Sequence, residues 1–198
     1  DRRELMVSNA RLKKEGFLLE RNGFQLVKHI STVSDFLDQK TLNMIYRKEI
    51  ERLILDLTGA SRVHLFDHTL RSSDNNSSGP IWMRETVNYV HNDYTNRSAP
   101  KRVQDILPED AKELLQHRFS IIQVWRTLRS PVEKLPLAMC DAQSLSREDF
   151  LIMERTRKEG PGGNNRVGEL YHFAFNEKHK WFYFPKMIQD EVLVFKTF

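Results

Sequence analysis

The sequence has little cysteine and no long hydrophobic run. Cys140 is the single cysteine among 198 residues, so no disulfide can form within the chain, which is typical of a protein from a reducing compartment. We therefore expect a cytoplasmic location. No apolar stretch approaches the roughly 18 residues of a membrane-spanning helix, and residues 1–6 are charged where a signal peptide would be apolar. The sequence therefore argues against a membrane protein.

A concentrated charge of one sign is also absent. The net charge is +4, from 31 Lys and Arg against 27 Asp and Glu, and the two signs alternate in stretches such as residues 47–52. The densest basic stretch, residues 155–158, lies between Glu154 and Glu159. A nucleic-acid-binding surface needs a basic patch or stripe, usually with aromatic residues. The charge pattern therefore argues against a nucleic-acid partner.

The hydrophobic residues that are present, 39% of the chain, suffice for a folded core and form recognisable patterns. Apolar residues recur at helical spacing over residues 40–58, and Gly59 is a natural stop for that helix. Asn22-Gly23 between two apolar runs is a strong hairpin signal. It predicts strands at 16–21 and 24–29.

After Gly59 the pattern changes to many short strands. We expect strands at 62–71, 87–94, 119–126, 137–140, 168–175, 180–184 and 191–198, a hairpin joining 168–175 to 180–184, one helix at 108–117, and loops at 72–79 and 160–165. This spacing is typical of an antiparallel barrel or jelly roll. The predicted fold is mainly β with flanking helices.

The chain is expected to form one domain over residues 1–198. In this interpretation, residues 1–60 supply an N-terminal hairpin and helix that pack on a core formed by residues 61–198. The last predicted strand runs to the final residue with no turn or tail. We therefore expect the core to be incomplete at its C-terminal end.

His91 and Asp93 are the residues with the clearest chemical potential. In a strand, residues i and i+2 point to the same face, so this His-x-Asp pair presents an imidazole and a carboxylate together. Such a pair supplies two ligands of the 2-His-1-carboxylate triad, which leaves open positions on Fe(II). The alternative is a surface His–Asp pair. Spacing alone leaves the third ligand open among His117, His172 and His179.

The chain resembles a known family along most of its length. The segments that carry the resemblance are 22–26, 58–63, 66–69, 91–95, 98–103, 124–126, 136–142, 179–185 and 190–196. In this order they are similar to the mostly fungal non-haem Fe(II), 2-oxoglutarate-dependent hydroxylases and desaturases. That family includes gibberellin desaturase, the aspergillic-acid hydroxylase/desaturase and the small component of cephem 7-alpha methoxylase.

The resemblance implies a double-stranded β-helix core, of the jelly-roll or cupin-like kind, and an iron site with His91 and Asp93 as ligands. It places the third ligand, a histidine, beyond Phe198, so neither His172 nor His179 is given that role. The implied cofactors are Fe(II), 2-oxoglutarate and O2. The implied reaction is oxidation of an unactivated C–H bond, by hydroxylation, desaturation or cyclisation, in a small secondary-metabolite or amino-acid-derived substrate.

Further candidate residues each have a structural alternative. Arg126 can hold a carboxylate of 2-oxoglutarate by a bidentate contact, or form a buried ion pair with Asp141. Trp125 and Arg126 are adjacent in a strand and point to opposite faces, so one of them alone can line the interior. The candidates for the wall of the substrate pocket are Tyr94, Trp125, Trp181 and Tyr183, although aromatic residues in strands are more often core. No catalytic residue beyond the metal ligands is predicted.

Two functions of other classes remain open. A non-catalytic jelly-roll binding module, as a degenerate member of the family, would keep the fold without the metal. A zinc-type metal hydrolase would use the same His and Asp ligands with water in an open position.

Overall fold

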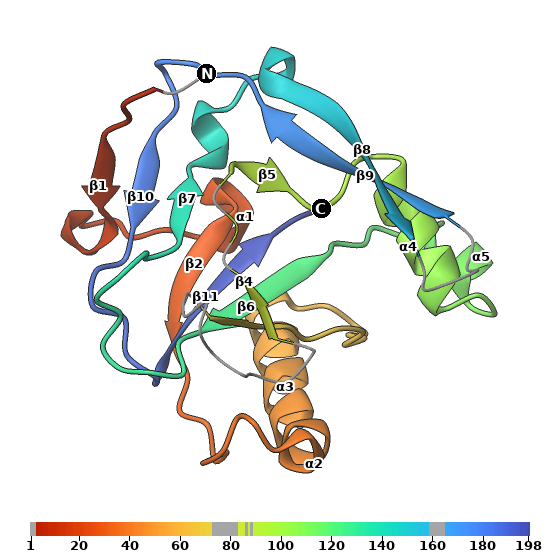
Figure 1. The fold of residues 1–198 in the computed structure, drawn as a ribbon. Helices are drawn as coiled ribbons and strands as arrows, with labels where there is room; N and C mark the ends of the chain where they lie inside the picture. The colour runs from red at the N-terminus through yellow and green to blue at the C-terminus, as the bar shows by residue number, and fades with distance from the viewer. Residues whose placement is uncertain (1–2, 73–82, 86, 88, 159–164) are drawn as a thin grey trace.

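Short strands make up most of the regular structure in this computed structural model, which describes residues 3–72, 83–85, 87, 89–158 and 165–198 (Figure 1). The strands are β1 (Val7–Asn9), β2 (Phe24–Lys28), β3 (Leu70–Ser72), β4 (Met83–Glu85), β5 (His91–Asn92), β6 (Ile122–Arg126), β7 (Ala138–Cys140), β8 (Phe150–Lys158), β9 (Asn165–Phe173), β10 (Trp181–Tyr183) and β11 (Glu191–Lys196). The α-helices are α1 (Leu19–Asn22), α2 (Gln39–Thr41), α3 (Arg47–Thr58), α4 (Ser98–Ile106) and α5 (Ala111–Leu114). The predicted mainly β architecture with few helices is confirmed. Within the described ranges, no helix has the length and apolar character needed to cross a bilayer.

Strand β11 lies at the centre of the structure, between β2 and β6 in an antiparallel three-stranded sheet (Figure 1). Its residues Val192, Leu193 and Val194 are completely buried. Three consecutive buried side chains point alternately to the two faces of a strand, so both faces of this sheet must be covered. The predicted strands at 119–126, 137–140 and 191–198 are confirmed as the slightly shorter β6, β7 and β11.

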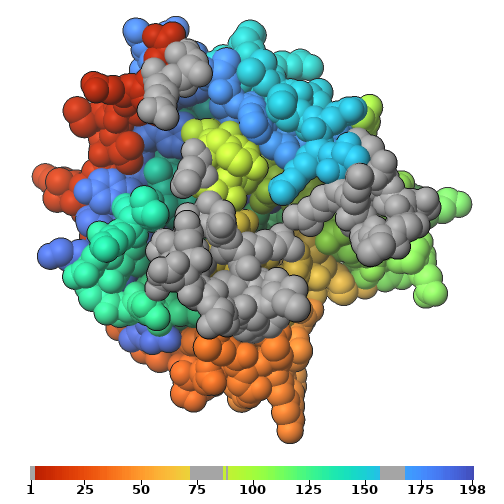
Figure 2. All heavy atoms as spheres, in the orientation of Figure 1, coloured from red at the N-terminus to blue at the C-terminus, as the bar shows by residue number. Residues whose placement is uncertain are grey.

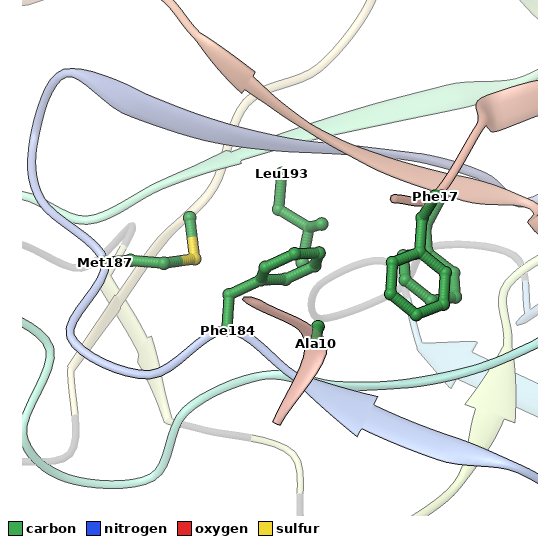
Figure 3. Close-up of a cluster of buried hydrophobic side chains, with 6 residues drawn as sticks. Ala10, Phe17, Phe184, Met187 and Leu193 are labelled. Carbon is green, nitrogen blue, oxygen red and sulfur yellow. The ribbon is translucent and has the colours of Figure 1, made fainter. Parts of the chain in front are cut away.

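Aromatic residues cover one face of this sheet, which we call the inner face. Leu193 packs there in a buried cluster with Phe17, Phe24, Phe184, Met187 and Ala10 (Figure 3). The ring centroids of Phe17 and Phe24 are 4.7 Å apart. Leu193 is paired with Leu26 of β2 and Trp125 of β6, so these side chains continue the same face.

Helix α3 covers the other face, which we call the outer face. Val192 and Val194 pack there against Ile50 and Ile54. The predicted helix over 40–58 is confirmed as one helical run that begins with α2 at Gln39, passes through a π-helical turn at Leu42–Tyr46, and ends with α3. Gly59 ends it with a φ of 66°, in the left-handed region that favours glycine.

The predicted hairpin at Asn22-Gly23 is wrong. Residues 19–22 form α1, and Gly23 is its C-cap with a φ of 83°. Asn22 is completely buried, and its amide accepts from Leu18 N at 3.0 Å and donates to Asp141 Oδ1 at 3.0 Å. Asn-Gly was ambiguous because a positive φ serves a helix C-cap as well as a hairpin turn.

The predicted hairpin between 168–175 and 180–184 is also wrong. Strand β9 pairs with β8 and β5, whereas β10 pairs with β7 and, in parallel, with β1. The hairpin that forms instead is β8–β9. Its two strands are paired at nine positions, from Phe150 with Phe173 to Lys158 with Asn165. Its strand β8 was missed because residues 154–158 are mostly charged and lack the alternation of a half-buried strand.

Residues 62–117 differ most from the sequence prediction. The strand expected at 62–71 is reduced to β3, which pairs in parallel with β4, and the strand expected at 87–94 is reduced to β5. The helix expected at 108–117 is reduced to α5, while α4 was not predicted because Pro100 lies inside it, in the first turn, where proline is tolerated. The loops expected at 72–79 and 160–165 lie outside the described residues, apart from Ser72 and Asn165.

The buried position of Leu193 leads to a stability prediction. Leu193→Ala removes a completely buried side chain from the aromatic cluster on the inner face, so it is expected to lower the free energy of unfolding by about 2–5 kcal/mol. Denaturant unfolding measures this change. Leu12→Ala, at an exposed position, is the control and should change stability little. Equal effects of the two variants would contradict the central position of β11.

Candidate metal centre

His91 and Asp93 lie together at the end of β5, as their spacing predicted. The His91 Nε2 and Asp93 Oδ1 atoms are 3.6 Å apart, and the two side chains are 24% and 45% exposed. His91 Nδ1 is 3.0 Å from the carbonyl oxygen of Tyr89. A donor bond from Nδ1–H to that carbonyl leaves the lone pair on Nε2, beside the carboxylate.

The pair is electrostatically coupled. The contact with Asp93 raises the pKa of His91, although burial and the charge of Arg71 oppose the rise. The contact with His91 in turn lowers the pKa of Asp93, and a hydrogen bond from Gln123 adds to that effect. The lowered pKa of Asp93 keeps the carboxylate ionised, as a metal ligand requires, whereas the raised pKa of His91 means that a metal ion would have to displace a proton from Nε2.

Residues from β6 and from the end of β11 hold this segment in place. Gln123 Nε2 donates to Asp93 Oδ2. The Asn92 amide donates to the Thr197 carbonyl oxygen at 2.9 Å, and Thr197 N donates to the Ile121 carbonyl oxygen at 2.8 Å. In Figure 2 the yellow-green residues around β5 lie near the centre of the visible face, next to the β8–β9 hairpin in cyan and blue.

Sequence reasoning missed Gln123. One signal was available, because Gln123 is a polar residue in the otherwise apolar stretch 121–125. A polar residue at an inward position of such a strand needs a partner, and here the partner is a predicted metal ligand.

His172 lies opposite His91 in the pairing of β5 with β9. The Tyr89 ring contacts both imidazoles, with centroid distances of 5.1 Å to His91 and 5.2 Å to His172. His117 is exposed after α5. Among the described residues, no group of three or more His, Cys, Asp or Glu side chains is placed to hold one metal ion.

His179 belongs to a different cluster. Its Nε2 is 2.9 Å from Asp149 Oδ2, and the two side chains are 4% and 6% exposed. Hydrogen bonds from Asn176 and then from His179 hold the pKa of Asp149 well below its usual range. A turn histidine is ordinarily solvated, but this one is a buried partner of a carboxylate that also accepts from Ser146 N at 2.7 Å.

Arg126 lies on the outer face of the sheet, opposite Val192 and away from Gln123. Its guanidinium donates to the Tyr46 hydroxyl and to the His29 carbonyl oxygen, at 3.1 Å each, and to the Gln189 carbonyl oxygen. Its binding of 2-oxoglutarate stays a prediction, and these contacts favour a structural role instead. The sequence offered Asp141 as an ion-pair partner of Arg126. The Asp141 carboxylate instead accepts a hydrogen bond from the Asn22 amide.

Three of the four aromatic candidates border one broad cavity. The cavity is bordered by Tyr89, His91, Asp93 and Gln123, and Tyr94, Trp125 and Trp181 also line it, whereas Tyr183 does not. Trp125 shares the inner face with Leu193, so it takes the interior position for which Trp125 and Arg126 were expected to compete. Arg126, on the outer face, borders the same broad cavity. The Trp181 indole Nε1 is buried and has no hydrogen-bond partner among the described residues. Burial raises the pKa of Tyr94, and the nearby Arg102 opposes the rise.

Comparison with known proteins places the chain in a family of enzymes. A family model described as an oxidoreductase/YMDC permease-like domain matches residues 1–198. Oxidoreductase AN1597 of Emericella nidulans is 31% identical over 98% of this chain and 71% of its own length. Alpha-ketoglutarate-dependent dioxygenase phiK of a fungal species is 30% identical over 94% of this chain and 67% of its own length.

The structural comparison agrees. The solved structure of the iron and alpha-ketoglutarate-dependent endoperoxidase NvfI superposes with a TM-score of 0.85 and 27% identity, over 97% of this chain and 70% of that one. The chain thus spans roughly two thirds of the length of the relatives it matches. It belongs to the family of Fe(II)/2-oxoglutarate-dependent dioxygenases, whose cofactors are Fe(II), 2-oxoglutarate and O2.

The Asp149–His179 pair predicts a pH dependence of stability. Because the pKa of Asp149 is lower in the folded protein than in the unfolded chain, the pair stabilises the fold fully above about pH 4. That stabilisation is lost as the pH falls through the folded pKa. Asp149→Asn should therefore destabilise the protein at neutral pH, with a difference from the unsubstituted chain that shrinks in acid. Denaturant unfolding at several pH values measures it, and Asp56→Asn, at an exposed ion pair, is the control.

The contacts of Arg126 predict that its substitution lowers stability without weakening the binding of 2-oxoglutarate. Arg126→Met leaves the carbonyl oxygens of His29 and Gln189 without their donor, so it should lower the free energy of unfolding by roughly 2 kcal/mol. The dissociation constant for 2-oxoglutarate, measured on the folded fraction with Fe(II) present, should stay unchanged. A large rise in that constant with unchanged stability would restore the co-substrate role.

Proposed function

We propose that His91 Nε2 and Asp93 Oδ1 are two of the protein ligands of the iron in this dioxygenase. The observation that carries the proposal is their 3.6 Å separation. Two ligand atoms that each lie about 2.1 Å from one ion are separated by at most about 4.2 Å, so a single ion fits between them. The Tyr89 carbonyl fixes the imidazole, and Gln123 occupies the second carboxylate oxygen.

We further propose that the third ligand is a histidine beyond Phe198. The relatives are longer than the matched region, so they carry chain outside it. The Asn92 amide bonds the Thr197 carbonyl oxygen, so chain continuing past Phe198 would start beside β5. His179 is committed to Asp149, and this supports leaving it out of the ligand set.

Bound iron and 2-oxoglutarate would supply the oxidising power needed to break an unactivated C–H bond, with O2 as oxidant. The residues of the chain have the tasks of binding, orientation and exclusion of water. Tyr94, Trp125 and Trp181 would form walls of the pocket next to the ligands, and their contact with the same cavity supports this role. Tyr183 does not border this cavity and is left out of the wall.

The substrate is proposed to be a small molecule of secondary metabolism or derived from an amino acid. Aromatic walls suit an apolar or partly apolar compound whose reacting carbon must be held at one place. The matched endoperoxidase and dioxygenase depend, as their names state, on alpha-ketoglutarate and, for the endoperoxidase, on iron, which supports an oxygenase over the zinc hydrolase and the non-catalytic module. Hydroxylation, desaturation and cyclisation all remain within this proposal.

The finer description of the fold is part of the same proposal. Residues 1–198 would belong to one domain with a double-stranded β-helix core, with the N-terminal helices packed on it. The arrangement that supports it is a set of small sheets in which most strand pairs are antiparallel. A cytoplasmic location is proposed from the single cysteine.

An anaerobic titration tests the iron site. The natural protein that carries this chain is titrated with Fe(II) and then with 2-oxoglutarate, and the visible absorbance is followed. A charge-transfer band that needs both additions is expected, because 2-oxoglutarate chelates the ferrous ion. Asp93→Ala should lose the band because it removes a ligand.

The control is Asp110→Ala, which removes a carboxylate from a surface ion pair with Arg62 and should keep the band. Absence of the band from the unsubstituted protein would overturn the proposal. Its persistence in Asp93→Ala would overturn the assignment of Asp93.

A further inference from the structure

Gln123 is an unusual residue for its position. Strand β6 is an edge of the sheet β2-β11-β6, and its neighbours Ile122 and Val124 pack on the outer face against the α3 side. Gln123 and Trp125 alternate with them and so share the inner face. Gln123 is paired with Phe195, which packs against the aromatic cluster. An amide at this place needs a polar partner within reach.

That partner is one oxygen of the proposed iron ligand. Gln123 Nε2 donates to Asp93 Oδ2, whereas Oδ1 is the oxygen 3.6 Å from His91 Nε2. The two carboxylate oxygens are therefore in different environments, one bonded to an amide and one beside the imidazole. An amide donor on one oxygen engages one of its two lone pairs and reduces its basicity, which favours the other oxygen as the metal ligand.

The backbone around Gln123 is held firmly. Ile121 N donates to the Phe198 carbonyl oxygen at 2.9 Å, and the Ile121 carbonyl oxygen accepts from Thr197 N at 2.8 Å. The Thr197 carbonyl oxygen accepts from Asn92, the residue before Asp93. The donor and the acceptor of the Gln123–Asp93 bond are thus attached to the same hydrogen-bonded framework, so the bond has a fixed geometry.

We infer that Gln123 is a positioning residue that makes Asp93 a monodentate ligand through Oδ1. This inference rests on the proposed iron site. A carboxylate that bound through both oxygens would take an additional coordination position. A monodentate carboxylate leaves three positions of a six-coordinate ion open beside two histidines, which is the number that a chelating 2-oxoglutarate and one further ligand need.

The test compares metal affinity with stability in the natural protein that carries this chain. Co(II) is the probe, because it binds such sites without reacting with oxygen as Fe(II) does, and its visible absorption reports coordination number. Gln123→Met keeps the length and flexibility of the side chain and removes the amide donor. Binding of Co(II) is measured by calorimetry, and unfolding is measured without metal.

Gln123→Met is expected to bind Co(II) about 10–100-fold more weakly, which is the usual effect of losing a partner of a metal ligand. Its Co(II) absorption should change, and its unfolding should change little. Gln116→Met, at an exposed glutamine, is the matched control and should bind like the unsubstituted protein. If Gln123→Met does not fold, Gln123→Asn replaces it, because its shorter side chain keeps the amide but does not reach Asp93.

The outcomes separate this inference from the iron site itself. Unchanged Co(II) affinity and absorption in a folded Gln123 variant, with binding lost in Asp93→Ala, would overturn the role of Gln123 and leave the iron site standing. Lower stability with unchanged Co(II) binding would show that Gln123 supports the fold and not the metal ligand. That result would also overturn the proposed positioning role. No Co(II) binding by the unsubstituted protein would overturn both proposals together.

Discussion

The two-sided burial of β11 is the constraint on which the rest of the structure depends. Val192, Leu193 and Val194 exclude water from both faces of the sheet at once, and burial of apolar surface is the main favourable term in folding. The strand therefore needs an aromatic layer on one face and helix α3 on the other. Because β11 pairs with β6 in a fixed register, the same burial determines which residues of β6 point inward.

The register of β6 against β11 also determines the geometry of the candidate metal centre. A shift of β6 by one residue would turn Gln123 and Trp125 to the helix side and Arg126 to the interior. In the observed register, Gln123 reaches Asp93, and Arg126 reaches Tyr46 and backbone oxygens on the helix side. The end of β11 also meets β5 through the Asn92–Thr197 bond. The core thus fixes both the support of the carboxylate and the position of the strand that carries it.

The sequence predicted those parts of the fold whose pattern has a single interpretation. The apolar run at 192–195 allows little besides a buried strand, and the helix over 40–58 has both its period and its glycine stop. Asn22-Gly23 failed because positive φ occurs in two kinds of structure, and the choice was made by a distant residue, Asp141. Strand β8 failed because an exposed strand imposes no hydrophobic alternation, and residues 154–156 are exposed.

In the candidate site, too, some features could be predicted from the sequence and others could not. The proximity of His91 and Asp93 was predictable, because two residues i and i+2 in a strand share a face without any tertiary information. The partner of Asp93 was not, because Gln123 is 30 residues away and its reach depends on how β6 packs. The same holds for Arg126, whose orientation follows from the pairing of β6 with β11.

Two inward amides, Asn22 and Gln123, show how burial separates structural from functional polar residues. Asn22 is completely buried and bonds Leu18, Arg21, Asp141 and Gln143, so its hydrogen-bonding capacity is used within the fold. Gln123 instead donates to a carboxylate whose side chain is 45% exposed. An exposed carboxylate has water as an alternative partner, so this bond contributes little to folding. What it determines is the orientation of the carboxylate, and a fixed orientation matters where the other oxygen must meet a metal ion.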